Sequence, residues 1–169
     1  ALWGEHRFSG KINHKKSEFG ASYRIGPRDF YGMSRDNEEI FHLADGTELH
    51  RKETGDPSHA RMFMHNVNLN YSIQDPEKYL FNATFRYWNN HQPNWDYRGI
   101  LSNLENPDDY VDMVDLNSED NQVPALDLYY QRNLKNDQTL VFNVVGTYNR
   151  TSSHRFYQES RDQEPLTDI

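Results

Sequence analysis

Residues 63–73 read FMHNVNLNYSI, and their side chains alternate in character with a period of two. Successive side chains of a β-strand point to opposite faces, so this alternation predicts a long strand with one apolar and one polar face. The apolar parity holds Phe63, His65, Val67, Leu69, Tyr71 and Ile73, and the polar parity holds Met64, Asn66, Asn68, Asn70 and Ser72.

The same alternation continues beyond a short polar turn at 74–78, where residues 79–88 read YLFNATFRYW. Two alternating runs joined by a short turn predict a β-hairpin. Similar pairs of alternating runs occur before and after this hairpin in the sequence. We therefore expect three hairpins, near 3–26, 61–91 and 123–151, with turns near 16, 76 and 137. These hairpins provide about six long antiparallel strands.

Two long connections, 28–60 and 92–122, separate the hairpins and are expected to be loops. Connections of this length are uncommon inside a compact domain and are usually functional. The first contains a candidate small hairpin around Asp45 and Gly46. In the second, Asn106 is a candidate N-cap and Pro107 a candidate first helical residue, with acidic residues following, so we predict a short helix over 107–116.

The composition of the 169 residues excludes several classes of protein. The formal net charge of −8 argues against nucleic acid as a partner, since phosphate binding requires a basic surface. The absence of cysteine excludes disulfides, cysteine-based zinc sites and thiol catalysis. No apolar run has the roughly 18–20 residues of a transmembrane helix. Only 35% of residues are hydrophobic, yet 14% are aromatic, which favours ordered surfaces over disorder.

Short turns at one end, long loops at the other and strands of ten or more residues are typical of an outer-membrane-type β-barrel. The alternative is a soluble antiparallel sheet with one face on a core and one face in water. Two observations favour the barrel. The turns and loops alternate consistently over three hairpins, and the polar parity is rich in asparagine rather than in lysine and glutamate.

Residues 124–148, PALDLYYQRNLKNDQTLVFNVVGTY, resemble barrel strands of TonB-dependent outer-membrane receptors, and 66–71 and 80–87 are similar in style. The resemblance implies a barrel of twenty-two strands with an N-terminal plug. Such a receptor imports a siderophore, a glycan or a similar nutrient across the outer membrane of a Gram-negative cell. A periplasmic energy-transducing protein drives the import.

The chain departs from that pattern in three respects. It has room for about six strands, it shows no plug or energy-coupling segment, and its last residues are not a terminal aromatic strand. We therefore expect 1–169 to be a single β-domain, an internal part of such a barrel in contact with outer-membrane lipid. On its own the segment is expected to self-associate through its sheet edges or its apolar faces.

The segment 88–95, WNNHQPNW, is the strongest candidate for ligand binding. Indole rings can stack on a sugar, and amides can hydrogen-bond its hydroxyl groups. The alternative is an interfacial aromatic girdle followed by a turn. An ion pair between Arg86 and Asp127 on a neighbouring strand is a further expectation. The residues predicted to contact a ligand are Arg86, Trp88, Asn89, Asn90, His91 and Trp95.

Neither catalysis nor a bound metal or cofactor is expected. The chain lacks a Gly-x-Ser-x-Gly motif and a glycine-rich phosphate loop, and its eight histidines have no zinc-ligand spacing. The carboxylates of 105–120 are suited to calcium, but without the usual ligand order a solvated acidic loop is the better interpretation. Two alternatives to the receptor remain: a soluble all-β carbohydrate-binding module using Trp88 and Trp95, and a hydrolase with its site at a barrel rim.

Overall fold

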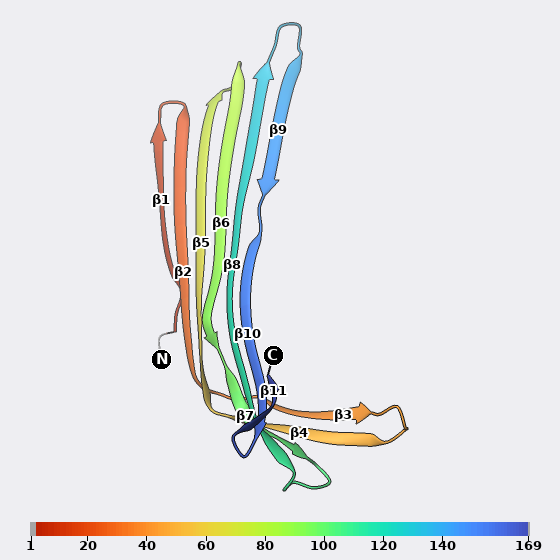
Figure 1. Cartoon of the computed structure of the whole chain (residues 1–169). Coiled ribbons are helices and arrows are strands. Elements are labelled where there is room, and N and C mark those ends of the chain that lie inside the picture. The colour runs from red at the N-terminus through yellow and green to blue at the C-terminus, as the bar shows by residue number, and fades with distance from the viewer. Residues whose placement is uncertain (1–2, 169) are drawn as a thin grey trace.

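The computed structural model describes residues 3–168, which form one antiparallel sheet of 11 strands (Figure 1). No helix of the described chain is long and apolar enough to cross a membrane. The strands are β1 (His6–His14), β2 (Ser17–Met33), β3 (Asp36–His42), β4 (Glu48–Asp56), β5 (Ser58–Asp75), β6 (Tyr79–Trp95), β7 (Tyr97–Asn103), β8 (Tyr110–Asn133), β9 (Thr139–Thr147), β10 (Arg150–Arg161) and β11 (Glu164–Asp168).

The long strands lie side by side in the order β1, β2, β5, β6 and β8, and β9 and β10 follow one another along the free side of β8. Three turns connect β1 to β2, β5 to β6 and β8 to β9 at the same end of the sheet (Figure 1). These pairings confirm the predicted turns near 16, 76 and 137. Lys15, Asn136 and Asp137 have a positive φ, as tight turns require.

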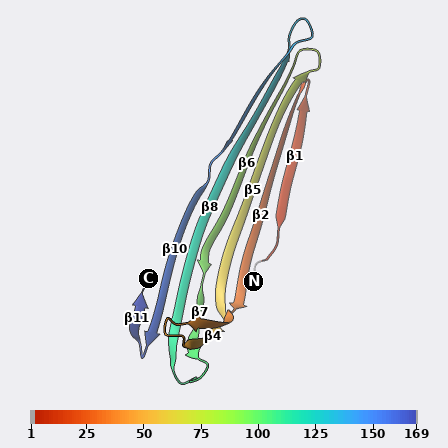
Figure 2. The ribbon, with the colours of Figure 1, turned by 90° about the vertical axis from the view of Figure 1, so that its right-hand side faces the viewer.

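A second branch leaves the far end of β8 in the order β7, β4 and β3. In Figure 1, β3 and β4 project sideways from the long strands; in Figure 2 the sheet is a long, thin layer with β4 and β7 at its lower end. The predicted hairpin around Asp45 and Gly46 is confirmed, since it connects β3 to β4. Gly46 has a φ of 85°, and the backbone N–H of Thr47 donates to Oδ1 of Asp45.

The register between neighbouring strands places the apolar side chains of each strand opposite those of the next, so that they form rows across the sheet. One row runs across five strands as Phe19, Tyr71, Ala83, Leu128 and Val144, each directly opposite the next. We call the aligned set the apolar band, and the opposite surface of the sheet the polar face. The apolar band comprises Phe8, Ile12, Phe19, Ala21, Tyr23, Val67, Leu69, Tyr71, Ile73, Phe81, Ala83, Phe85, Tyr87, Pro124, Leu126, Leu128, Tyr130, Phe142 and Val144.

The apolar band is exposed most on the edge strands β1 and β9 and is half-buried on the central strands. In the apolar band Phe8 is 65% exposed, Ile12 69% and Phe142 60%. The largest fully buried side chains, Met113 and Asp115, lie near the start of β8 on the polar face, where β7 and β10 flank it. The core is therefore small and lies at the end of the sheet opposite the three turns.

The sheet is open and does not close into a barrel. Two sequence expectations about it are wrong. The first is the number of strands, which is 11 instead of about six. The connections 28–60 and 92–122 are not loops: the long strands continue into both segments, and β3, β4 and β7 lie within them. The sequence predicts short turns at one end of the sheet and long loops at the other. The short turns are present, but the other end is formed by β3, β4, β7 and the extensions of the long strands.

The predicted helix over 107–116 is also wrong. Residues 106–109 form a turn in which the N–H of Asp109 donates to the carbonyl of Asn106 at 2.9 Å, and β8 begins at Tyr110. The N-cap pattern favours a helix through local contacts only, whereas Tyr110 and Val111 form strand pairs with β7. Aromatic and β-branched side chains favour that pairing, and it outweighs the local preference.

Candidate functional site

Strand β6 carries all six residues predicted to contact a ligand, but the alternation of the strand divides them between two faces. Arg86, Trp88 and Asn90 project from the polar face, opposite Ala125, Val123 and Asn121 of β8. Asn89 and His91 have the opposite parity. The predicted set therefore does not form one site.

Asn89 and His91 connect β6 to β8 through Asp120. Nδ2 of Asn89 donates to Oδ1 of Asp120 at 2.9 Å and to the backbone carbonyl of Asn121 at 3.1 Å. Nδ1 of His91 lies 3.4 Å from the same Asp120 oxygen. Since Asn89 is buried and these contacts join two strands, its role is to stabilise the sheet.

Trp95 lies beyond an irregularity in the pairing of β5 with β6. Its Nε1 donates to the hydroxyl of Tyr97 at 3.3 Å, and its ring meets Phe30 edge-on at 6.1 Å between centroids. The indole is half-buried and its only donor is already bonded. Trp95 therefore packs the far end of the sheet rather than forming a pair of stacking platforms with Trp88.

The predicted ion pair between Arg86 and Asp127 is not formed in the structure. Arg86 lies opposite Ala125, and Asp127 lies opposite Thr84. The two side chains are thus diagonal neighbours, and none of the ion pairs between described residues joins them.

Trp88 lies on the polar face in a row of side chains that crosses the sheet from β1. Arg7, Arg24, Asn66 and Trp88 lie opposite one another in that order on β1, β2, β5 and β6. Two adjoining cavities, of about 240 and 210 Å³, open on this row and share Arg24 and Asn66 in their linings. The sequence did not predict that Arg7, Arg24 and Asn66 lie near Trp88. The reason is that β3 and β4 separate β2 from β5 along the chain, so nothing local indicates that β2 and β5 pair.

At the far end, four charged side chains form what we call the ionic cluster: Arg35, Glu53, Asp115 and Arg155. Arg155 binds Asp115 with two nitrogens, Nε to Oδ1 at 2.8 Å and Nη2 to Oδ2 at 3.0 Å. Arg35 donates from Nε to Oε1 of Glu53 at 2.8 Å and places Nη1 3.5 Å from Oδ2 of Asp115. The guanidinium of Arg35 also lies 4.3 Å from the ring centre of Tyr97.

Opposing effects act on the pKa of Asp115, which is only 2% exposed. Burial raises this pKa, but hydrogen bonds from Arg155 and Asn117 and the charges of Arg155 and Arg35 outweigh burial and hold the pKa below its usual value. The carboxylate is therefore ionised at neutral pH. Its oxygens are occupied by side chains of the protein, so the cluster fixes the segment before β3 and strand β4 to β8 and β10 instead of offering a free acid.

A tyrosine next to the ionic cluster also has a shifted pKa. Burial and the hydrogen bond of its hydroxyl to Glu159 raise the pKa of Tyr157 to about 12. That bond measures 2.6 Å, and Nη1 of Arg51 approaches the same Glu159 oxygen at 3.3 Å. The hydroxyl is thus held protonated as a donor, which suits a structural contact.

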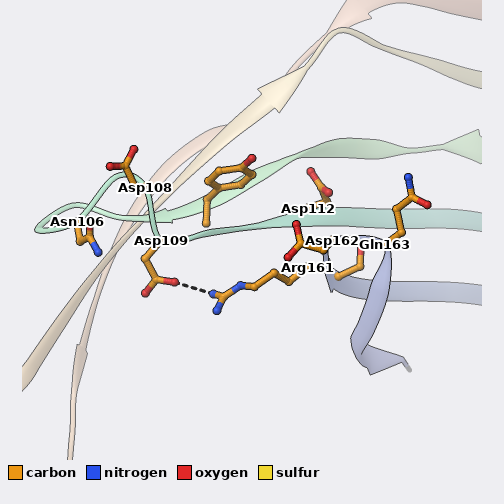
Figure 3. Close-up of a pocket in the computed structure, with 9 residues that line it drawn as sticks. Asn106, Asp108, Asp109, Asp112, Arg161, Asp162 and Gln163 are labelled. Atoms are coloured by element: carbon orange, nitrogen blue, oxygen red, sulfur yellow. Dashed lines mark hydrogen bonds and ion pairs between the residues drawn. The ribbon is translucent and has the colours of Figure 1, made fainter.

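An acidic cavity of about 670 Å³ lies between the 106–109 turn and the end of β10 (Figure 3). Asp109 is paired with Arg161 at 2.6 Å, while Asp108, Asp112 and Asp162 complete an acidic lining. Across residues 3–168, no three His, Asp or Glu side chains are grouped closely enough to hold a metal ion. The carboxylates that the sequence placed in one acidic loop are instead spread along β8 and its turn.

An aspartate–histidine pair, as a hydrolase would use, lies on β2 and β5. Asp29 contacts Nε2 of His59, and the ring of Tyr31 stacks on that of His59 at 4.2 Å between centroids. Nε of Arg61 lies 3.3 Å from the same histidine nitrogen. In the described chain no serine or threonine hydroxyl is bonded to His59, so a nucleophile is missing from this group.

No protein-family model matches the chain, and no curated protein matches it either.

Proposed function

We propose that the chain is a membrane-spanning part of an outer-membrane receptor of the TonB-dependent type, with a function in nutrient transport rather than catalysis. The single observation that carries the proposal is the apolar band. It is continuous across β1, β2, β5, β6, β8 and β9 and is exposed or half-buried, while the charged side chains of Glu53 and Asp115 are buried at the far end of the sheet. Lipid is the solvent in which that arrangement is stable.

The height of the apolar band fits a bilayer. On β5 it extends from Val67 to Ile73, which is about 20 Å of strand. The side chains at both ends add to this length, and outer-membrane barrels present an apolar belt about 25 Å tall. Of the 18 residues of β5, only this stretch needs to contact lipid, so the remainder would extend outside the membrane.

Aromatic side chains lie at both limits of the band. Tyr23 and Tyr87 belong to the row farthest from the turns, and Phe81, Tyr130 and Phe142 to the row nearest them. Tyrosine is favoured at membrane interfaces because its ring is apolar and its hydroxyl reaches water. Two tyrosines in the row farthest from the turns and one in the row nearest them thus support a membrane orientation with the strands crossing the bilayer.

The edges of the sheet support a larger barrel. The outer sides of β1 and β9 have no strand beside them within residues 3–168, and the apolar band extends to both. Lipid cannot satisfy the hydrogen bonds of an open edge, so spanning sheets are closed. In the proposed receptor, further strands close the barrel, the polar face lines its interior, and a periplasmic energy-transducing protein drives import of a siderophore, a glycan or a similar nutrient.

The second candidate, a soluble carbohydrate-binding module, is favoured by one observation: Trp88 lies on the polar face among amides and arginines that can bind a sugar. That function would require a protein surface, rather than lipid, to cover the apolar band. The two candidates therefore differ in what contacts Leu69, and they agree on the polar face.

Quenching by brominated lipids tests the proposal. In the full chain reconstituted into vesicles, with all three native tryptophans replaced by phenylalanine, Leu69→Trp should be quenched strongly. Asn68→Trp, one residue away on the polar face, is the matched control and should be quenched weakly. Equal quenching at both positions, or a chain that remains in water as a monomer without lipid, would contradict the membrane role and favour the module.

A further inference from the structure

We infer that the polar face between β1 and β6 binds an acidic oligosaccharide. This inference rests on the proposed function, because it assigns a ligand class to the polar face of the proposed receptor. The residues that carry it are Arg7, Arg24, Arg28, Asn66, Asn68 and Trp88, of which only Trp88 was predicted from the sequence.

The first observation is a concentration of positive charge on a chain that carries a net charge of −8. Arg7 and Arg24 are directly opposite on neighbouring strands, an arrangement that is destabilising unless an anion offsets it. The nearest acid is Glu5, whose carboxylate lies 3.5 Å from Arg24, with both side chains exposed to solvent. This single exposed carboxylate pairs with Arg24 and also lines the cavity of about 210 Å³, but it leaves Arg7 without a partner in the described chain.

Two further arginines on the polar face extend the positive surface. Arg28 lines the cavity of about 210 Å³, and Arg86 lies one row nearer the turns than Trp88. Neither of them, nor Arg7, is in an ion pair with any residue of the described chain. Guanidinium groups bind carboxylates through two parallel hydrogen bonds, so these side chains are suited to a ligand with more than one carboxylate.

The second observation is the cavity itself. The two cavities of about 240 and 210 Å³ share Arg24 and Asn66, so they are two lobes of one depression extending across β1, β2, β5 and β6. Each lobe alone is smaller than a usual ligand pocket of roughly 300–1,000 Å³, whereas the two together fall within that range. An extended ligand with repeated charges would occupy both lobes.

The third observation concerns the uncharged lining. Trp88 presents an indole to the second lobe, and an indole face stacks on the apolar face of a sugar ring. The amides of Asn66 and Asn68 make no side-chain hydrogen bond within the described part of the chain, and both side chains line the first lobe. Free amides are suited to sugar hydroxyls, which both donate and accept. An inorganic anion would accept hydrogen bonds from the arginines and the amides but would make no use of the indole face.

Tryptophan fluorescence in detergent micelles tests this inference. In the full chain carrying Trp3→Phe and Trp95→Phe, Trp88 is the only indole and reports its own surroundings. Trigalacturonate should change its emission in a saturable way, and added salt should weaken the effect. The neutral trisaccharide maltotriose and inorganic phosphate should produce little change at the same concentrations.

Arg24→Gln should weaken trigalacturonate binding by about tenfold or more, since it removes the arginine common to both lobes. Arg98→Gln is the matched control, because Arg98 lies on β7 with its side chain exposed, away from these cavities, and it should leave binding unchanged. Each variant must retain the β-sheet circular dichroism of its parent, so that lost binding is distinguished from lost folding.

Equal binding of maltotriose would overturn the role of the arginines, and equal binding of phosphate would overturn the oligosaccharide. Absence of any binding would overturn the site as a whole. These outcomes are independent of lipid contact: quenching of Leu69→Trp by brominated lipid together with no sugar binding would reject the inference and leave the membrane role in place.

Discussion

Asp115 shows at the scale of one residue how this sheet is stabilised at its far end. Its carboxylate is almost fully buried, yet it accepts hydrogen bonds from Arg155, Arg35 and Asn117. A buried charge is tolerated only when it is paired and hydrogen-bonded. Asp115 thereby joins β8 and β10 to the segment that precedes β3, and no sequence motif marks it for that role.

Replacing Asp115 by asparagine should lower the free energy of unfolding of this end by about 2 kcal/mol, the usual contribution of hydrogen bonds between charged groups. The change keeps the size of the side chain but leaves Arg155 and Arg35 without their shared anion. Urea unfolding followed by the fluorescence of Trp95, the only tryptophan kept, measures the loss. Asp108→Asn, in the exposed turn, is the control and should have no effect.

The stability of the same end should depend on pH through Asp115. Because the pKa of the folded carboxyl is lowered, its contribution is complete above the unfolded value of about 4 and is lost as the pH falls through the lower folded value. The difference in stability between the parent and Asp115→Asn should thus be present at pH 7 and decrease below about pH 4. An undiminished difference in strong acid would show that the carboxylate charge is not responsible.

At the scale of elements, the contact between β4 and β7 depends on two glycines that lie opposite each other, Gly55 and Gly99. A Cβ at Gly99 would collide with the carbonyl oxygen of Thr54 and lie 2.8 Å from Cα of Gly55. At Gly55 a Cβ would lie 2.6 Å from backbone atoms of Arg35. The backbones approach so closely that no larger residue fits without separating the strands.

Gly99→Ala should therefore separate β4 from β7 and destabilise the β3–β4 hairpin, at a cost of about 1–3 kcal/mol as for other overpacked sites. Trypsin cleavage at Lys52, within β4, should become faster than in the parent. Gly10→Ala is the matched control, since a Cβ there meets nothing within 4 Å. Equal cleavage rates in the two variants would show that the close approach is not required.

At the scale of the whole molecule, the exposed apolar band controls behaviour in water. A continuous band across six strands contrasts with the single, scattered apolar side chains on the surfaces of most soluble monomers. The free edges at β1 and β9 add unpaired backbone groups that can pair with another sheet. The isolated chain should therefore be stable only where lipid, detergent or another copy covers the band.

We predict that the chain self-associates in detergent-free buffer and disperses when detergent is added. Light scattering across a detergent titration measures the change, and association should bury the band residues Val67, Leu69, Phe85 and Leu128. Replacing Leu69 and Phe85 together by asparagine should reduce association, whereas Asn68→Gln on the polar face should not. A parent chain that stays monomeric without detergent would contradict the exposed band.

Much of the main sheet could be predicted from the sequence, because its signals are local. A period of two over ten residues assigns each side chain to a face, and short polar segments between such runs locate the turns. The same rules failed at 107–116, where a helical capping pattern precedes a strand. They also failed at 28–60 and 92–122, where β3, β4 and β7 carry weaker alternation.

The sequence by itself determined the antiparallel hairpins and the division of their side chains into two faces. Only the tertiary structure decided that β8 pairs with four different strands, that residues 35, 53, 115 and 155 share one ionic cluster, and that Arg7 and Arg24 lie in line with Asn66 and Trp88. The physical reason is range. Alternation acts between neighbours along the chain, whereas these contacts depend on which strands lie side by side, and residues as far apart as 35 and 155 carry no mark of that pairing.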